Sequence, residues 1–308
     1  MVIHKEYKKN QLMIGSNGRK QKKHVFDWVN LICLSLFAIA SIYPLIYVIA
    51  GSFNEGSDYI NGGIWLFPRV FSFENYQVVL NDMRLWKSFG ITIARTVLGT
   101  FLSVIYTAVV AYAMSRPNLI GKPIIYRFFI FTMFFGGGLI PYFILIKNLG
   151  LYDNFLVYII PSLFNFYNMI IFMSYFREMS PALEESAKLD GANDFKIFVR
   201  IILPLSTPVL ATIALFNGVG HWNDYFTGVM YINNASLQPI QTYLYRIVAS
   251  ASASKAVVAM PAGMTAQQVS SNSVRLATMV VTTFPIMCVY PFLQKYFVKG
   301  FMVGSVKG

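Results

Sequence analysis

Six stretches of mostly apolar residues alternate with polar connections along the chain. A membrane-spanning helix needs about 20 predominantly apolar residues, and each stretch is close to or above that length. The pattern therefore predicts an all-α membrane protein with six transmembrane helices, at about 28–50, 89–114, 128–146, 155–176, 208–230 and 276–297. It also divides the chain into a basic tail over 1–24 and a transmembrane domain over 25–308.

The composition narrows the class of protein. Of the 308 residues, 56% are hydrophobic and 12% are charged, and the mean hydropathy is +0.54. An average soluble domain has about 25% charged residues. A soluble protein of this composition would expose large apolar patches, so a soluble enzyme, a nucleic-acid binder and a disordered chain are all poor interpretations.

Lys and Arg outside the apolar stretches indicate the orientation, because cytoplasmic segments are enriched in them. The tail has one acidic residue, Glu6, and seven basic ones: Lys5, Lys8, Lys9, Arg19, Lys20, Lys22 and Lys23. We therefore expect a cytoplasmic N-terminus and, after six spans, a cytoplasmic C-terminus. A cleaved signal peptide fits poorly, because the first apolar stretch exceeds the 7–15 residues of a signal core.

Two features interrupt the apolar stretches. Arg95 lies about two turns from the outer end of the second predicted span. Charge inside a span is a functional candidate by default, but near a helix end we favour snorkelling to the interface or a structural pair. Gly136–Gly138 and Pro141 interrupt the third span, and they mark either a kink on a transport path or close helix packing.

The polar connection at 179–208 predicts two short helices. Gly191 is typical of a left-handed helix end, and Asn193 can cap the helix that follows. Glu184 and Lys188 are four residues apart, which predicts an ion pair on one helix face. Such a unit fits a groove on a soluble partner. The alternative, a helix lying on lipid, is disfavoured because its acidic residues gain nothing from an anionic membrane surface.

The spacing in this connection resembles the EAA loop of ABC importer permeases. The match is Glu185-x-Ala187-x3-Gly191-x9-Ile201-x-Leu203-Pro204, and Asp190-Gly191-Ala192 extends it to the carbohydrate-uptake (maltose-type, binding-protein-dependent) branch. Ser186 departs from the usual alanine, although both residues are small. Shorter similarities cover nearly everything after the tail. Those at 138–141 and 217–223 resemble permeases for complex oligosaccharides, including uronate-rich fragments.

The resemblance implies a type I ABC importer permease fold in a bacterial cell (inner, or plasma) membrane, crossed several times. It implies three kinds of partner: an extracytoplasmic sugar-binding protein, a second permease subunit forming a heterodimer, and two ATPase subunits that bind ATP and Mg. The loop at 179–208 would carry a coupling helix that docks on the ATPase. The residues implied in this coupling are Glu184, Glu185, Ser186, Ala187, Asp190, Gly191 and Ala192.

The sequence offers no catalytic chemistry of its own. It lacks the phosphate-binding pattern G-x-x-x-x-G-K-[ST], so we expect no ATP hydrolysis on this chain. It also lacks H-E-x-x-H and any cluster of Cys and His, so we expect no metal site, no cofactor and no catalytic residues. We expect His221, in the fifth span, to be a packing residue rather than a proton relay.

Aromatic residues make up 16% of the chain, and aromatic rings can stack on sugar rings. Most of them will face lipid, the interface or the core. The candidates for a substrate path are four residues clustered in the fifth span: Trp222, Asn223, Tyr225 and Phe226.

The leading hypothesis is therefore a permease subunit of an ATP-driven importer for sugars, in particular oligosaccharides. One alternative is an ABC permease for a non-sugar solute, such as a peptide, phosphonate or polyamine. Another is an ion-coupled secondary transporter. Transporters of that class place ionisable groups near the membrane centre, and in this sequence Arg95 and His221 have no evident carboxylate partner.

Overall fold

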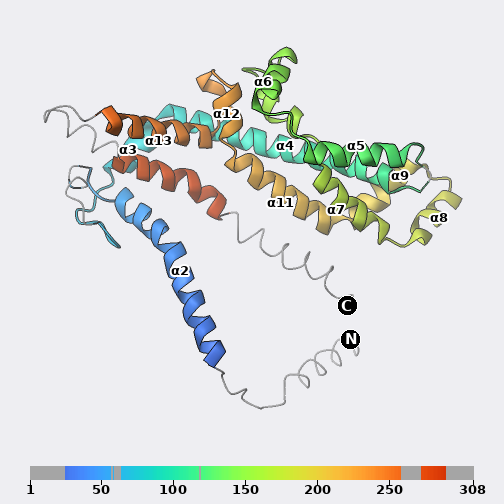
Figure 1. Ribbon diagram of the computed structural model, residues 1–308, viewed down its shortest axis with the longest axis horizontal. Coiled ribbons are helices and arrows are strands. Elements are labelled where there is room, and N and C mark those ends of the chain that lie inside the picture. The colour runs from blue at the N-terminus through green and yellow to red at the C-terminus, as the bar shows by residue number, and fades with distance from the viewer. Residues whose placement is uncertain (1–24, 57, 59–63, 118, 258–271, 289–308) are drawn as a thin grey trace. The chain divides into compact units, whose positions relative to one another are not determined.

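The computed structural model describes residues 25–56, 58, 64–117, 119–257 and 272–288 (Figure 1). The predicted basic tail at 1–24 and the C-terminal end of the sixth predicted span lie outside these residues. The chain divides into two compact units, Met1–Tyr47 and Val48–Gly308. Regular structure in the described residues is helical, and one isolated antiparallel bridge joins Asn54 and Phe71.

Figure 1 labels most of the helices. In chain order the elements are α2 (Val25–Ser52), α3 (Glu74–Asn81), α4 (Met83–Ser115), α5 (Lys122–Phe134), α6 (Leu139–Asn148), η2 (Phe155–Tyr158), η3 (Ile160–Ser162), α7 (Phe166–Arg177), α8 (Pro181–Leu189), α9 (Asp194–Ile197), η4 (Phe198–Ile202), α10 (Leu203–Leu205), α11 (Thr207–Asn223), α12 (Phe226–Tyr231), η5 (Ala235–Leu237) and α13 (Ile240–Val257). A further helix covers 272–288.

The first two predicted helices are confirmed as α2 and α4. Both are long and apolar enough to cross a membrane. On α2 the side chains of Leu34, Phe37 and Ile39 are exposed, which suits contact with lipid. α4 begins six residues before the predicted start at 89, because Asp82 caps it by accepting a hydrogen bond from the backbone N–H of Arg84 (2.9 Å).

The third predicted helix, 128–146, is instead a pair of helices. α5 and α6 meet at an angle of 117°, across a break at 135–138. Gly138, at the end of the break, has a φ of +86°, which glycine adopts without strain. The glycine run therefore ends one helix and starts another, which is a much larger change of direction than a kink.

The fourth and fifth predicted helices are also broken. Residues 155–162 form the short 3₁₀ stretches η2 and η3, and these meet α7 at 47°. Asn165 starts α7 by accepting a hydrogen bond from the N–H of Asn168 (3.0 Å). The predicted helix over 208–230 is divided at Asp224 and Tyr225 into α11 and α12. The sixth predicted helix corresponds to 272–288 as far as the structure describes it.

Helix α4 is the central element of the second unit. It packs along α11 and α7, and its buried face runs through Thr92, Arg95, Gly99, Ser103 and Ala108 at helical spacing. At the end where α4 meets the loop at 179–208, an apolar core joins it to α7, α11 and that loop. Members of this core are Tyr112, Phe172, Phe176, Ala187, Ile197 and Ile213.

Candidate functional site

A cavity of about 330 Å³, lined by both polar and apolar groups, lies against α4 in the second unit. Several elements contribute to its walls, including α6, the 3₁₀ stretches and both sides of the α11–α12 break. The lining residues are Arg95, Tyr142, Ile146, Val157, Tyr158, Pro161, Ser162, Asn217, Gly220, His221, Asp224, Thr227 and Tyr231. The volume is at the small end of the range of ligand pockets, about 300–1,000 Å³.

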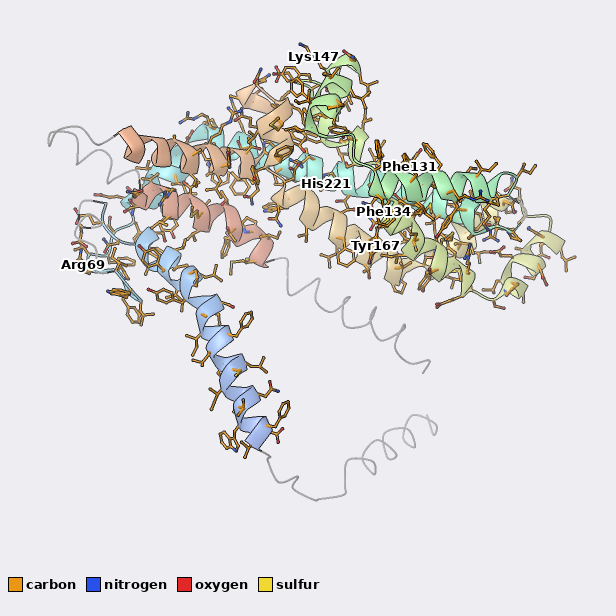
Figure 2. All side chains as sticks on the ribbon, viewed as in Figure 1. Arg69, Phe131, Phe134, Lys147, Tyr167 and His221 are labelled. Atoms are coloured by element: carbon orange, nitrogen blue, oxygen red, sulfur yellow. The ribbon has the colours of Figure 1, made fainter. Side chains whose placement is uncertain are left out.

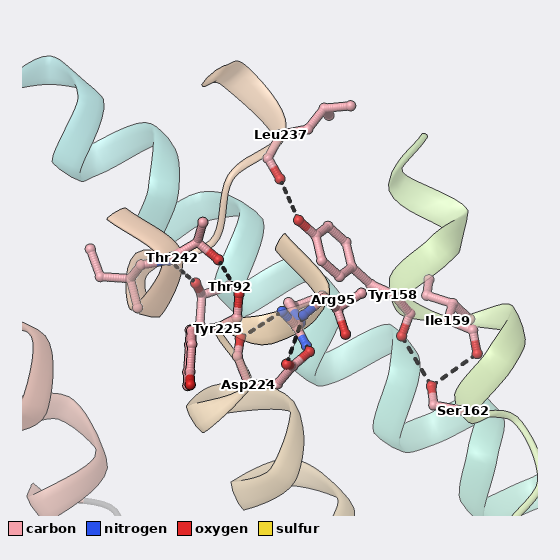
Figure 3. Close-up of polar contacts among 11 residues, drawn as sticks. Thr92, Arg95, Tyr158, Ile159, Ser162, Asp224, Tyr225, Leu237 and Thr242 are labelled. Atoms are coloured by element: carbon pink, nitrogen blue, oxygen red, sulfur yellow. Dashed lines mark hydrogen bonds and ion pairs between the residues drawn. The ribbon is translucent and has the colours of Figure 1, made fainter. Parts of the chain in front are cut away.

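Arg95 and Asp224 form an ion pair at this cavity (Figure 3). The Nη2 atom of Arg95 lies 2.5 Å from Oδ2 of Asp224, and Nη1 donates to the backbone carbonyl of Asp224 (3.1 Å). The guanidinium carbon lies 4.3 Å from the ring centroid of Tyr158, which is a cation–π contact. The Arg95 side chain is 2% exposed and that of Asp224 is 28% exposed, so the carboxylate is the more accessible partner.

The break between α11 and α12 gives this pair its geometry. A helix break frees backbone carbonyls, which need partners inside a membrane. The carbonyl of Asp224 accepts from Arg95, and that of Tyr225 accepts from Thr242 Oγ1 of α13 (3.0 Å). The Asp224 side chain also accepts from the N–H of Thr227 (3.1 Å), in the first turn of α12. One aspartate therefore fixes the break and neutralises Arg95.

Of the two expectations favoured for Arg95, the structural pair is confirmed and snorkelling is wrong. The side chain points into the protein because an anion is available there. The expectation that Arg95 lacks a carboxylate partner is also wrong. Asp224 was missed, although it lies within the apolar stretch 208–230. The charge of Asp224 in that stretch was the available signal, because an unpaired charge is expensive inside a membrane.

His221 is a buried residue that also lines the cavity (Figure 2). It approaches α4 so closely that a Cβ at Gly99 would lie 2.5 Å from its Nε2 atom. The expectation of a packing histidine agrees with this contact. Gly99 is therefore required because the imidazole occupies the space of a side chain at that position.

A chain of amide and hydroxyl groups joins three helices beside the cavity. Asn168 of α7 donates to the side-chain oxygen of Asn217 (3.1 Å), and Asn217 donates to Ser103 Oγ of α4 (3.2 Å). Polar side chains link helices in this way within membranes. Since Asn217 lies on α11 and lines the cavity, the network holds part of the wall in place.

The four predicted path residues lie elsewhere. Trp222 lines an apolar groove of about 800 Å³ between α4, α11 and the helix at 272–288. Asn223 ends α11, and Phe226 begins α12. Tyr225 stacks on Tyr245 of α13, with ring centroids 4.9 Å apart. Contact of these residues with a substrate stays a prediction.

The loop at 179–208 contains the two predicted short helices, α8 and α9. Gly191 has a φ of +76°, and its N–H donates to the carbonyl of Lys188 (3.0 Å). Asn193 caps α9 by accepting from the N–H of Lys196 (2.9 Å). Both local predictions are confirmed, since these are the bonds that such residues make at helix ends.

The predicted coupling residues differ in exposure. Ala187 is buried and belongs to the apolar core, and Ala192 is partly buried against it. Four of them are exposed: Glu185, Ser186, Asp190 and Gly191. The buried residues hold the loop against the apolar core, whereas the exposed residues form a surface that a partner can reach.

Glu184 is partly buried, and its ion-pair partner is Arg116, at the end of α4. The predicted pair of Glu184 with Lys188 is therefore wrong. Lys188 lies near Asp194 instead, with Nζ 3.5 Å from Oδ1. Arg116 also stacks on Tyr112, its guanidinium carbon 4.0 Å from the ring centroid. These residues line a groove of about 810 Å³ between the end of α4 and the loop.

Comparison with known proteins adds the family. Residues 87–303 match the family described as "Binding-protein-dependent transport system inner membrane component". The chain is 38% identical to the polygalacturonan/rhamnogalacturonan transport system permease protein YtcP of Bacillus subtilis, over 93% of this chain and all of that protein. This chain belongs to the permease family of binding-protein-dependent importers.

Two further relatives support the assignment. The arabinooligosaccharides transport system permease protein AraQ of Halalkalibacterium halodurans is 24% identical, over 94% of this chain and all of that protein. Among solved structures, a chain of a bacterial ABC transporter involved in the import of the acidic polysaccharide alginate is 33% identical, with a TM-score of 0.80. That match covers 89% of this chain and 96% of the other, so the fold is that of an ABC importer permease.

Proposed function

We propose that this chain is the membrane-spanning permease subunit of an ATP-driven importer for oligosaccharides that an extracytoplasmic binding protein delivers. The observation that carries the proposal is its 38% identity, over 93% of its length, to a permease named for polysaccharide transport. The cavity beside α4 supports it, because hydroxyl, amide and tyrosine groups are the contacts that a sugar needs.

The loop at 179–208 is the proposed coupling element. Its support is the surface described above: Glu185 on α8 and Asp190 directly after it are exposed, and the buried Ala187 holds α8 in place. An ATPase subunit that holds ATP and Mg would bind this surface, and its movement would reach α4 through the ion pair between Glu184 and Arg116. A second permease subunit would complete the path.

We further propose six spans with both ends of the chain in the cytoplasm, in the bacterial inner (plasma) membrane. The support is the basic N-terminal tail and the number of apolar stretches. The bent pairs α5–α6 and η2–α7 would each act as one broken span. Broken helices are tolerated where they lie against protein or a water-filled cavity.

An ion-coupled secondary transporter is a weaker candidate than an ATP-driven importer. The reason is the family to which the chain belongs, and not a lack of paired charged residues in its spans. Arg95 does have a carboxylate partner, Asp224, as the ionisable sites of such transporters often do. Family membership nevertheless favours ATP-driven import. The remaining question of cargo, sugar or non-sugar, is addressed by the names of the relatives, which refer to carbohydrates.

The test is uptake of labelled oligosaccharide into proteoliposomes that contain the chain with its co-purifying subunits. Uptake should require ATP and should persist when a protonophore and a sodium ionophore collapse ion gradients. The chain purified alone should hydrolyse no ATP. Uptake abolished by the ionophores at constant ATP would contradict the proposal.

A further inference from the structure

The charged side chains that line the cavity beside α4 balance each other. Within the part of the chain that the structure describes, they are Arg95 and Asp224, paired at 2.5 Å. We propose that this cavity binds an uncharged sugar unit and discriminates against a uronate. This inference rests on the proposed function, because it names the class of sugar that the same permease would accept.

Desolvation provides the discrimination. A carboxylate that enters the cavity loses part of its hydration free energy. This cost is compensated only where an unpaired cation binds the carboxylate. The guanidinium of Arg95 is already bound to Asp224 by its side chain and its backbone carbonyl. The Asp224 carboxylate is the more exposed partner, so an entering uronate meets a like charge first.

An uncharged ring meets groups that suit it. The Asp224 carboxylate can accept from a hydroxyl, which a uronate carboxylate cannot supply. Tyr142, an exposed residue that lines the cavity, offers a ring face that a sugar can contact.

Kinship leaves the charge of the cargo open. The chain resembles two proteins named for acidic polymers, polygalacturonan/rhamnogalacturonan and alginate, and one named for arabinooligosaccharides, which are uncharged. On our proposal, the cavity distinguishes between these two classes, because it prefers an uncharged sugar ring to a uronate ring. Its volume of about 330 Å³ admits a short part of an oligosaccharide.

The experiment is a binding titration of the full chain in lipid nanodiscs with two matched disaccharides. Galactobiose and digalacturonate, both α-1,4-linked, share their ring and linkage, and they differ in whether C6 is a hydroxymethyl group or a carboxylate. We expect galactobiose to bind about tenfold more tightly, or better. Tighter binding of digalacturonate, or no binding of either sugar at millimolar concentration, overturns the proposal.

Three variants test the cause. Asp224→Asn keeps the size and the capping group but leaves Arg95 uncompensated, so the preference for galactobiose should shrink or reverse. Arg95→Gln should increase it. Glu74→Gln makes the same charge change as Asp224→Asn at an exposed site on α3, and should leave the preference unchanged. Equal shifts in Asp224→Asn and Glu74→Gln overturn the role of the pair.

The two proposals fail in different measurements. If the complex imports no oligosaccharide of either class, the proposed function fails. If it imports oligosaccharides with ATP but the chain prefers digalacturonate, the function stands and the inference about charge fails. The wild-type titration needs no substitution, so poor folding of a variant cannot obscure that outcome.

Discussion

Arg116, directly after the last residue of α4, forms an ion pair with Glu184 of α8 and stacks on the ring of Tyr112. The same helix carries Arg95, whose partner Asp224 fixes the break between α11 and α12. One ion pair therefore links the end of α4 to the predicted coupling loop, and a second ion pair links α4 to the wall of the cavity. A displacement of α8 could therefore reach the cavity wall through α4, which is one continuous helix.

Loss of this attachment should weaken both stability and coupling. The side chains of Arg116 and Glu184 are 23% and 16% exposed, so the pair is partly shielded from solvent. We expect Glu184→Gln to lower the free energy of unfolding by about 1–2 kcal/mol and to reduce sugar-stimulated ATP hydrolysis by the assembled complex. Thermal unfolding in detergent and an ATPase assay measure the two effects.

The matched control is Glu178→Gln, the same chemical change at an exposed residue after α7. It should leave both quantities near the wild-type values. The exchange variant Arg116→Glu with Glu184→Arg should recover part of the loss. Equal effects of Glu178→Gln and Glu184→Gln would remove the special role of the pair.

Gly191 should be sensitive to the conformation that a substitution permits. Gly191→Pro fixes φ near −65° where the chain has +76°, and it removes the N–H that donates to Lys188. We expect the variant to reach the membrane but to lose co-purification of the ATPase. Glu185→Lys, which reverses an exposed charge on α8, should act in the same direction.

The control for Gly191→Pro is Gly191→Asn, because asparagine tolerates positive φ better than other residues with a side chain. It should retain most of the co-purified ATPase. Normal coupling in Gly191→Pro and Glu185→Lys would contradict the assignment of the loop. If Gly191→Asn lost as much co-purified ATPase as Gly191→Pro, the backbone conformation at residue 191 would not be the cause of the loss.

Local signals made the two short helices of the loop at 179–208 predictable. The left-handed Gly191 and the cap at Asn193 depend on residues a few positions apart, and both are present in the structure. The pairing of Glu184 was predicted wrongly from the same local reasoning. Its partner Arg116 is 68 residues away, and a partner brought close by folding replaced the helical neighbour Lys188.

Apolar length located the membrane segments but not their breaks. The stretches at 128–146 and 208–230 are long and apolar enough to predict single helices, yet each contains a break. The break at Asp224 is stabilised by Arg95, 129 residues away, and by Thr242. Because its stability comes from distant side chains, sequence periodicity carries no signal for it. The cavity depends on the same break and was missed for the same reason.

The orientation is testable with reporter fusions. A fusion after Lys307 should be cytoplasmic, and one at Gly62 should be on the outer side, because the basic residues of the tail hold the N-terminus inside. Paired alkaline phosphatase and fluorescent-protein fusions measure the two locations. A Gly62 fusion on the cytoplasmic side would reverse the orientation of the whole chain.

Asp82, which caps α4, should make stability depend on pH. Partial burial alone would raise the pKa of this carboxyl, but hydrogen bonds from Arg84 and from the Tyr243 hydroxyl (2.8 Å) lower the pKa overall. A lowered pKa means that the carboxylate stabilises the fold above the ordinary value, about 3.9, and that this contribution is lost as the pH falls below it.

Melting temperatures at about pH 6 and about pH 3 measure this effect, since the two values bracket the ordinary pKa. The wild type should lose more stability than Asp82→Asn between them. Glu74→Gln removes an exposed carboxylate from the neighbouring helix and should decline as the wild type does. Parallel declines in all three proteins would contradict the role of Asp82.

Two glycines on α4 allow a matched test of how closely His221 packs. A Cβ at Gly99 would lie 2.5 Å from Nε2 of His221, whereas a Cβ at Gly90 would meet nothing within 4 Å. Gly99→Ala should therefore displace the imidazole and lower the free energy of unfolding by about 1–3 kcal/mol. Gly90→Ala should be neutral or stabilising by up to about 1 kcal/mol, because alanine favours the helix.

The double variant Gly99→Ala/His221→Ala removes the clash. Once His221→Ala is present, adding Gly99→Ala should therefore cost little stability. Thermal unfolding of the four variants in one detergent measures these differences. Equal melting temperatures for Gly99→Ala and Gly90→Ala would show that the imidazole can move aside freely, and His221 would then not hold α11 against α4.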